Sequence, residues 1–301
     1  MHRRYVLGAI ASAAAAVLGA CANTSAPPPS AGFQSDRISV AAAGEGRDVI
    51  FIPGLSSHPE IWDSTVESLG PGYRVHLVHV RGFGGLEPGA NADGPVAAPV
   101  AEEIARYIEA NGLDHPAVIG HSMGGTIGMM LAARHPDSVG KLMVVDMFPF
   151  MGAMFGGPAA TPETLTPIAD NIRAQMAAVP QGVVTPILRQ TIESMVGTEA
   201  ARAQIIEHAR QSNNVTTANA FRELIVTDLR PELANITMPF TTLYVIPPQA
   251  PITPEQYAAF MVASYANIPQ ANVVRIDDSR HFIMIDAHAR FMQEVRAFLA
   301  E

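Results

Sequence analysis

Residues 117–125 read Ala117-Val118-Ile119-Gly120-His121-Ser122-Met123-Gly124-Gly125, a short apolar run that leads into a serine between glycines. The apolar run predicts a buried strand, and the residues from Met123 onward predict a helix. Small neighbours let the backbone turn tightly between the two, and the turn raises the Ser122 hydroxyl above the sheet at a helix N-terminus. The stretch therefore predicts a strand–turn–helix unit that presents a nucleophilic serine.

Outward from this turn, short apolar runs alternate with helical patterns from Arg37 onward. Such alternation is typical of an α/β fold with a mostly parallel sheet and helices on both of its faces. We expect strands at residues 38–42, 49–53, 75–80, 117–120, 142–146, 241–246 and 273–276. We expect helices between them at residues 96–111, 123–135, 254–265 and 287–299.

The alternation breaks between residues 147 and 236, where helical patterns follow one another and no strand is evident. This region predicts a helical cap inserted between two parts of the core, residues 37–146 and 237–301. It starts with Met147, Phe148, Phe150, Met151, Met154 and Phe155. Because methionine adapts its shape, this start suits a surface that accepts apolar ligands, or it packs the cap onto the sheet.

The N-terminus has the composition of an export signal. Arg3 and Arg4 precede an apolar run that ends at residue 20 and is too short to span a bilayer, so residues 1–20 predict a signal peptide. The sequence Leu18-Gly19-Ala20-Cys21 is similar to a bacterial lipobox and predicts a lipid anchor on Cys21, with an incidental cysteine as the alternative. Residues 21–36 then predict an extended tether. We expect an exported lipoprotein of the periplasm or cell envelope.

The charge of the chain limits its partners. Lys and Arg number 19 against 28 Asp and Glu, which gives a net charge of −9, and loss of Arg3 and Arg4 with residues 1–20 gives −9 − 2 = −11. Such a chain has no basic patch for nucleic acid and is repelled by anionic lipid, so membrane attachment would come from acyl chains. The oligomeric state stays open.

Four landmarks beside the serine turn point to a known family: Pro53-Gly54-Leu55, Trp62, Arg81-Gly82-Phe83-Gly84 and Ser279-Arg280-His281-Phe282. With them, the chain from about residue 38 to its end resembles the α/β-hydrolase family. The resemblance implies that Ser122 is the nucleophile and that His281 is the base that activates it. It also implies that the backbone N–H groups of Leu55 and Met123 form the oxyanion hole.

The acid of the implied catalytic triad departs from the family pattern. Family members commonly carry an acid after the penultimate strand, where this chain has Ala250. A neutral residue cannot stabilise the imidazolium that forms on the base. Asp146, which follows the strand after the serine turn, is our candidate, because some relatives draw their acid from that strand. Glu255 or Asp278, or no acid at all, are the alternatives.

The resemblance implies a serine hydrolase that cleaves a small apolar carboxylic ester through an acyl-enzyme at Ser122. A serine at this position argues against the dehalogenase and epoxide-hydrolase branches, whose nucleophile is Asp. Two other functions stay open. The neutral Ala250 motivates a non-catalytic lipoprotein that binds an apolar ligand, and acyl transfer to an alcohol would use the same residues as hydrolysis.

No cofactor and no metal is expected. The chain has neither a Cys/His cluster nor a glycine loop of the phosphate-binding kind. His76 and His79 are three residues apart on an expected strand and so point to opposite faces. His58, in the loop after Leu55, faces either the pocket or the solvent.

Overall fold

The computed structural model describes residues 33–157, 159–248, 250 and 252–300. The expected signal peptide, Cys21 and residues 21–32 of the expected tether lie outside the described residues. In the described part of the chain, no helix combines the length and the apolar character needed to cross a membrane.

Seven strands form one sheet in the order β1-β3-β2-β4-β5-β6-β7. The first strand pairs antiparallel with β3, and all other neighbours are parallel, so the expected mostly parallel sheet is confirmed. The strands are β1 (Ile38–Gly44), β2 (Gly46–Ile52), β3 (Gly72–Val80), β4 (Ala117–His121), β5 (Lys141–Val145), β6 (Phe240–Tyr244) and β7 (Ala271–Arg275).

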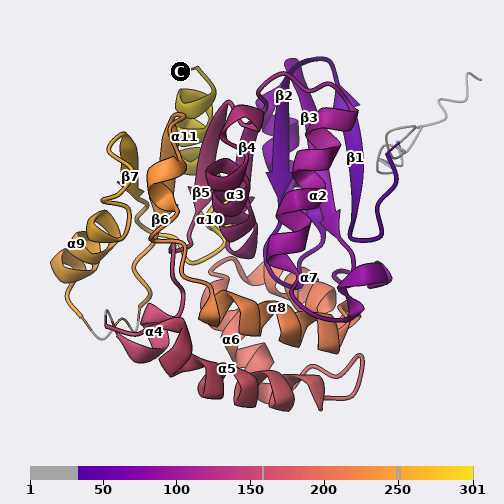
Figure 1. The fold of residues 1–301 in the computed structure, drawn as a ribbon, viewed down its shortest axis with the longest axis vertical. Coiled ribbons are helices and arrows are strands. Elements are labelled where there is room, and N and C mark those ends of the chain that lie inside the picture. The colour runs from indigo at the N-terminus through magenta and orange to yellow at the C-terminus, as the bar shows by residue number, and fades with distance from the viewer. Residues whose placement is uncertain (1–32, 158, 249, 251, 301) are drawn as a thin grey trace, which may run out of the picture.

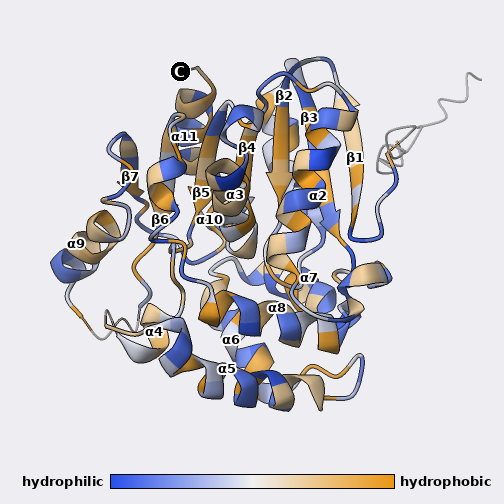
Figure 2. Ribbon diagram, in the orientation of Figure 1, coloured by the Kyte–Doolittle hydropathy of each residue, from blue (hydrophilic) through white to orange (hydrophobic). Residues whose placement is uncertain are grey.

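Successive strand residues point to opposite sides of the sheet, and both sides of the inner strands are apolar. Helices therefore cover both faces of the sheet. Val118 and Val144 belong to one buried cluster, while Ile119 and Val145 belong to the other. The first cluster is covered by α2 (Ala97–Ala110), α3 (Met123–Arg134) and α9 (Pro254–Ser264), and the second by α1 (Asp63–Leu69), α10 (Ile283–Asp286) and α11 (His288–Ala300). The inner strands are accordingly hydrophobic over most of their length, whereas the helices carry hydrophilic residues as well (Figure 2).

A helical cap is inserted between β5 and β6, as expected, and lies beyond the carboxyl ends of the strands (Figure 1). Its helices are α4 (Ala153–Gly156), α5 (Pro162–Ala177), α6 (Pro186–Met195), α7 (Glu199–Gln211) and α8 (Asn214–Val226). The side chains of Thr161, Thr185 and Asn213 accept a backbone N–H at the starts of α5, α6 and α8. These caps set the helix boundaries, because the first N–H groups of a helix have no partner within it.

The methionine- and phenylalanine-rich start of the cap divides into two parts. Met147 and Phe150 are buried, and Phe150 packs in a cluster inside the cap. Met154 and Phe155, on α4, have 54% and 43% of their surface exposed. Packing therefore accounts for Met147 and Phe150, whereas Met154 and Phe155 lie at the surface.

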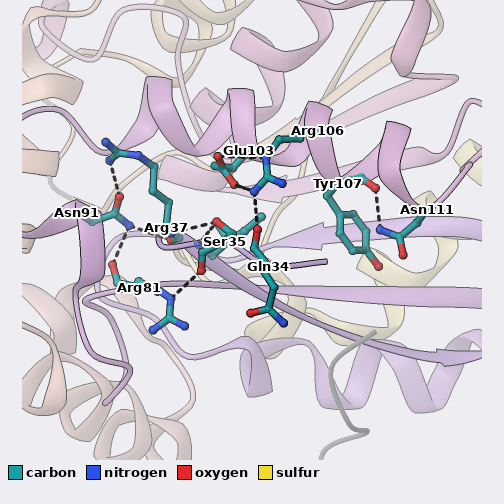
Figure 3. Close-up of polar contacts among 10 residues, drawn as sticks. Gln34, Ser35, Arg37, Arg81, Asn91, Glu103, Arg106, Tyr107 and Asn111 are labelled. Atoms are coloured by element: carbon teal, nitrogen blue, oxygen red, sulfur yellow. Dashed lines mark hydrogen bonds and ion pairs between the residues drawn. The ribbon is translucent and has the colours of Figure 1, made fainter. Parts of the chain in front are cut away.

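Residues 33–36 belong to the folded body, although we expected a tether through residue 36. The Phe33 ring contacts the Tyr107 ring edge-on at 5.1 Å, and the Arg106 guanidinium lies 4.4 Å from the Phe33 ring centre. Arg106 also donates to the Gln34 carbonyl at 2.6 Å, and Arg81 donates to the Ser35 carbonyl (Figure 3). The half-buried Phe33 ring packs against α2 and stabilises this short stretch, which composition alone marks as extended chain.

A buried carboxylate joins the cap to the core. Glu223, on α8, accepts the N–H groups of Val96, Ala97 and Ala98 at 2.5, 2.7 and 2.8 Å, and only 7% of its surface is exposed. These donors belong to the N-terminus of α2, where N–H groups are unpaired and the helix dipole favours negative charge. The ionised side chain therefore holds α8 against α2.

We expect Glu223→Gln to lower the free energy of unfolding by about 1–3 kcal/mol. The neutral amide replaces a charged acceptor, so the hydrogen bonds from the three N–H groups are weakened or lost. Glu232→Gln, which removes a partly exposed ion pair with Arg134, should cost less than about 1 kcal/mol. Urea denaturation followed by circular dichroism measures both variants. Equal losses in the two variants would contradict the role given to Glu223.

Candidate active site

Ser122 occupies the turn between β4 and α3 in a backbone conformation that is unusual for a residue with a side chain. Its φ is 53° and its ψ is −121°. The Ser122 N–H donates to the Val145 carbonyl at 2.9 Å, and the Ser122 carbonyl accepts from the Gly125 N–H at 2.7 Å. Such a conformation costs free energy and persists because the surrounding structure fixes it.

Glycines allow the backbones to meet around this turn. A Cβ atom on Gly120 would lie 2.2 Å from the Gly124 carbonyl oxygen, and one on Gly124 would lie 2.2 Å from the Ile52 carbonyl oxygen. Both distances are far below van der Waals contact, and the atoms concerned are backbone atoms that cannot swing away. The close approach of α3 to β2 and β4 therefore requires glycine at both positions.

Asp146 is the first residue after β5, and its carboxylate is held on both oxygens. Oδ1 accepts the Val245 N–H at 3.0 Å, and Oδ2 lies 2.6 Å from Nδ1 of His281. The backbone turns sharply at Asp146, with φ at 54°, and its N–H donates to the Leu243 carbonyl at 2.7 Å. This turn directs the carboxylate across the end of β6 toward His281.

His281 lies in the loop between β7 and α10. Because the Asp146 carboxylate accepts a hydrogen bond, Nδ1 carries the proton and the lone pair of the neutral ring is on Nε2. The His281 side chain is 21% exposed, so the ring is not sealed beneath packed protein. The geometry leaves Nε2 as the basic atom.

Asp286 fixes the loop that carries His281, a contact that the sequence did not reveal. Its carboxylate accepts the N–H of Arg280 at 3.1 Å and the N–H groups of Gly197 and Thr198 at 2.8 Å each. The last two belong to the connection between α6 and α7 in the cap. Asp286 thus joins the histidine loop to the cap.

His121 connects the serine turn to the histidine loop. Its ring centre lies 4.6 Å from that of His281, and its Nε2–H donates to the His281 carbonyl at 3.0 Å. Burial holds the pKa of His121 well below its usual value, and the nearby His281 lowers it further. A neutral His121 next to Ser122 therefore packs against His281 without competing as a base.

The loop after β2 meets Ser122 on another side. A Cβ atom on Gly54 would lie 3.1 Å from Cβ of Ser122, which places the Pro53-Gly54-Leu55 loop against the serine. Among the described residues, no hydrogen bond takes the backbone N–H of Leu55 or of Met123, the first residue of α3. Both donors are available to an oxygen bound beside Ser122.

The other candidate acids do not reach His281. Glu255 lies in the first turn of α9 and is exposed, and Asp278 takes a left-handed backbone conformation in the loop before His281. Within the described residues, the carboxylate bonded to the His281 ring is that of Asp146. Ala250 instead donates its N–H to the Pro247 carbonyl at 3.0 Å.

A cavity of about 370 Å³ opens beside the histidine loop. It is lined by the cap residues Gly197 and Thr198, by Pro248 after β6, and by residues 278–280 and Asp286. Five of these seven described residues have polar or charged side chains, and Ser122, Asp146 and His281 are not among the lining.

His76 and His79 have separate partners. His76 bonds to Asp48 at 2.8 Å and to the Tyr107 hydroxyl at 2.7 Å. His79 donates from Nε2 to the Phe83 carbonyl at 2.8 Å. The two imidazoles do not converge on one point.

Comparison with known proteins shows the family of this chain. The model of the alpha/beta hydrolase fold family matches residues 49–288, which is most of the chain. The chain belongs to the α/β-hydrolase family. A pimeloyl-[acyl-carrier protein] methyl ester esterase of Salmonella heidelberg is 30% identical over 209 residues, covering 67% of this chain and 76% of the relative. The prediction of a hydrolytic enzyme is thereby confirmed.

Solved structures of the same fold include an esterase from Exiguobacterium antarcticum, with a TM-score of 0.71, and an enol-lactonase from Burkholderia xenovorans, with a TM-score of 0.68. Each is 20% identical and covers 88% of this chain and 96% of its own. At this identity the likeness shows the shared fold.

We expect Gly124→Ala to lower the free energy of unfolding by about 3 kcal/mol or more, because its Cβ meets the Ile52 carbonyl. Gly128→Ala, in the same helix, is the matched control. Its Cβ would meet the Leu142 Cδ1 atom at 2.8 Å, and a side chain can rotate away. Thermal unfolding should show a large loss for Gly124→Ala and a small change for Gly128→Ala, and similar losses would contradict the backbone constraint.

Proposed function

We propose that the protein is a serine hydrolase of carboxylic esters, with Ser122, His281 and Asp146 as its catalytic residues. The observation that carries the proposal is the 2.6 Å contact between Asp146 Oδ2 and His281 Nδ1, beside the strained turn that bears Ser122. The acid orients the base, and the His281 ring packs against His121, the residue next to Ser122. These contacts support the arrangement needed to activate a serine.

In the first half of the reaction, His281 Nε2 takes the proton of the Ser122 hydroxyl as its oxygen attacks the ester carbonyl carbon. The carbonyl oxygen gains negative charge and accepts hydrogen bonds from the N–H groups of Leu55 and Met123. The tetrahedral intermediate then breaks its bond to the alcohol oxygen. The alcohol leaves with the proton from His281, and the acyl group remains on Ser122.

In the second half, a water molecule gives a proton to His281 Nε2 and attacks the acyl carbon. The intermediate releases the carboxylic acid, and Ser122 regains its proton from His281. Asp146 stays ionised throughout and stabilises the imidazolium that forms in each half. Its second hydrogen bond, from the Val245 N–H, keeps the carboxylate oriented.

The choice of ester is supported by the relative that is 30% identical, whose name is that of a methyl ester esterase. The hypothesis of a non-catalytic binder rested on the missing acid at Ala250. Since Asp146 supplies a carboxylate to His281, that hypothesis loses its basis. Transfer of the acyl group to an alcohol uses the same residues, and product analysis with competing alcohols separates it from hydrolysis.

We expect a fluorophosphonate probe to label the protein covalently, because an activated serine attacks phosphorus as it attacks an ester carbonyl. The label should be absent from Ser122→Ala, and peptide mass spectrometry should place it on Ser122 in the unmodified sequence. A folded wild-type protein that takes no label favours the non-catalytic binder.

We expect Asp146→Asn to reduce kcat by about 10⁴-fold, because an amide neither fixes the tautomer of His281 nor stabilises its charged form. KM should change little. Glu255→Gln, which alters an exposed carboxylate with no bond to His281, should retain wild-type kinetics. Hydrolysis of a chromogenic short-chain ester measures both variants, and wild-type turnover in Asp146→Asn would remove Asp146 from the mechanism.

A further inference from the structure

Three side chains with metal-ligating atoms meet where the cap contacts the core. His58 and Glu60 come from the loop after β2, Glu60 within the short 3-10 helix Pro59–Trp62, and His208 comes from α7 of the cap. One ligand atom from each of the three lies within 4.8 Å of the other two. None of these residues belongs to the proposed catalytic machinery.

The cluster is built around a buried imidazole. His208 is 3% exposed, and its Nε2 bonds to Oε1 of Glu60. Its other ring nitrogen, Nδ1, is buried and has no hydrogen-bond partner in the described part of the chain. Oε2 of Glu60 lies 3.6 Å from Nδ1 of His58, and both of these side chains are more than one third exposed. The cluster is therefore buried on the cap side and open to solvent on the core side.

A third histidine, His79, limits the position of His58. The His79 ring contacts the His58 ring edge-on, with ring centres 4.7 Å apart. His79 is itself held by its bond to the Phe83 carbonyl. A Cβ atom on Gly84 would lie 2.9 Å from Cβ of His58, so the loop after β3 also packs against it. His58 is thus held on the side of Glu60 and His208.

We propose that His58, Glu60 and His208 form a binding site for a divalent transition-metal ion of the Zn²⁺ kind. Two imidazoles and one carboxylate are the nitrogen and oxygen donors that such an ion takes, whereas Mg²⁺ and Ca²⁺ require oxygen donors alone. Zinc bonds of about 2.0–2.2 Å in a tetrahedron place neighbouring donors roughly 3.3–3.5 Å apart. Nδ1 of His58 lies 3.6 Å from Oε2 of Glu60, near this spacing, and it also accepts the Glu60 backbone N–H at 3.2 Å, a hydrogen bond that the ion would replace.

Binding of the ion displaces the hydrogen that now lies between Glu60 and His208. The proton moves to Nδ1 of the same ring, so that His208 stays neutral and presents the lone pair of Nε2 to the cation. Glu60 and His208 then move apart to accommodate the cation between them. Three protein ligands leave a fourth coordination position for water, on the side where His58 and Glu60 are exposed. The bound ion would cross-link α7 of the cap to the loop that follows Leu55.

The test uses the full folded chain, prepared without a histidine tag and freed of metal by a chelator. Isothermal titration with Zn²⁺ should show one bound equivalent. Titration with Co²⁺ should give the strong visible absorption of a four-coordinate site. Saturating Zn²⁺ should also raise the unfolding temperature, because the ion binds the folded state alone.

Two variants locate the site. His208→Gln keeps an amide that can donate to Glu60 but removes the buried ligand. His58→Ala removes a ligand whose side chain is 35% exposed, together with the hydrogen bond that caps the 3-10 helix Pro59–Trp62. Each should weaken Zn²⁺ binding by at least about tenfold. His135→Gln is the matched control, because His135 forms a similar pair with Glu102, at 2.8 Å, on the surface.

His135→Gln should bind Zn²⁺ as the wild type does. The proposal is overturned if the wild type binds no Zn²⁺, if the Co²⁺ spectrum is that of a six-coordinate ion, or if His58→Ala binds as tightly as the wild type. These measurements do not depend on ester hydrolysis, so their outcome is separate from that of the proposed function.

Discussion

The close approach of α3 to strands β2 and β4 is the constraint on which the site depends. With glycine at positions 120 and 124, the helix starts directly against the backbone of Ile52, and the intervening Ser122 is forced into its left-handed conformation. The free-energy cost of this conformation is offset by the packing of the neighbouring strands, since β4 and most of β5 are buried. The buried core thus holds the hydroxyl of the half-buried Ser122 in a fixed position.

Polar contacts join the cap to the parts of the core that surround this hydroxyl. Glu223 holds α8 to α2, Asp286 joins the histidine loop to the connection between α6 and α7, and Thr217 bonds to Ser56 beside Leu55 at 2.9 Å. Charged and polar contacts are directional, so each fixes one point of the cap relative to the core. The loops that carry His281 and Leu55 are thereby both positioned with help from the cap.

The sequence predicted all seven strands, the serine turn and the cap because each follows from local pattern: buried runs, glycine spacing and amphipathic helices. It missed contacts whose partners are distant in the chain. Asp286 binds Gly197 across 89 residues, and His208 bonds Glu60 across 148. The short helix α1 was missed too, since a seven-residue helix with one buried residue carries little periodicity. Phe33 gave no signal because its partners, Tyr107 and Arg106, lie on a distant helix.

The position of Asp146 shows how a carboxylate can reach the histidine from a place in the sequence that differs from the common family position. The base needs a carboxylate at its Nδ1, and nothing in the chemistry fixes which strand supplies it. Strands β5 and β6 are parallel neighbours, so their carboxyl ends are adjacent. The chain turns at Asp146, directly after β5, where the backbone is left-handed. The Asp146 carboxylate accepts a hydrogen bond from the Val245 N–H, just past the end of β6. Its carboxylate thus reaches His281 from the neighbouring strand, and Ala250 in the following loop can be neutral without leaving the imidazole unpaired.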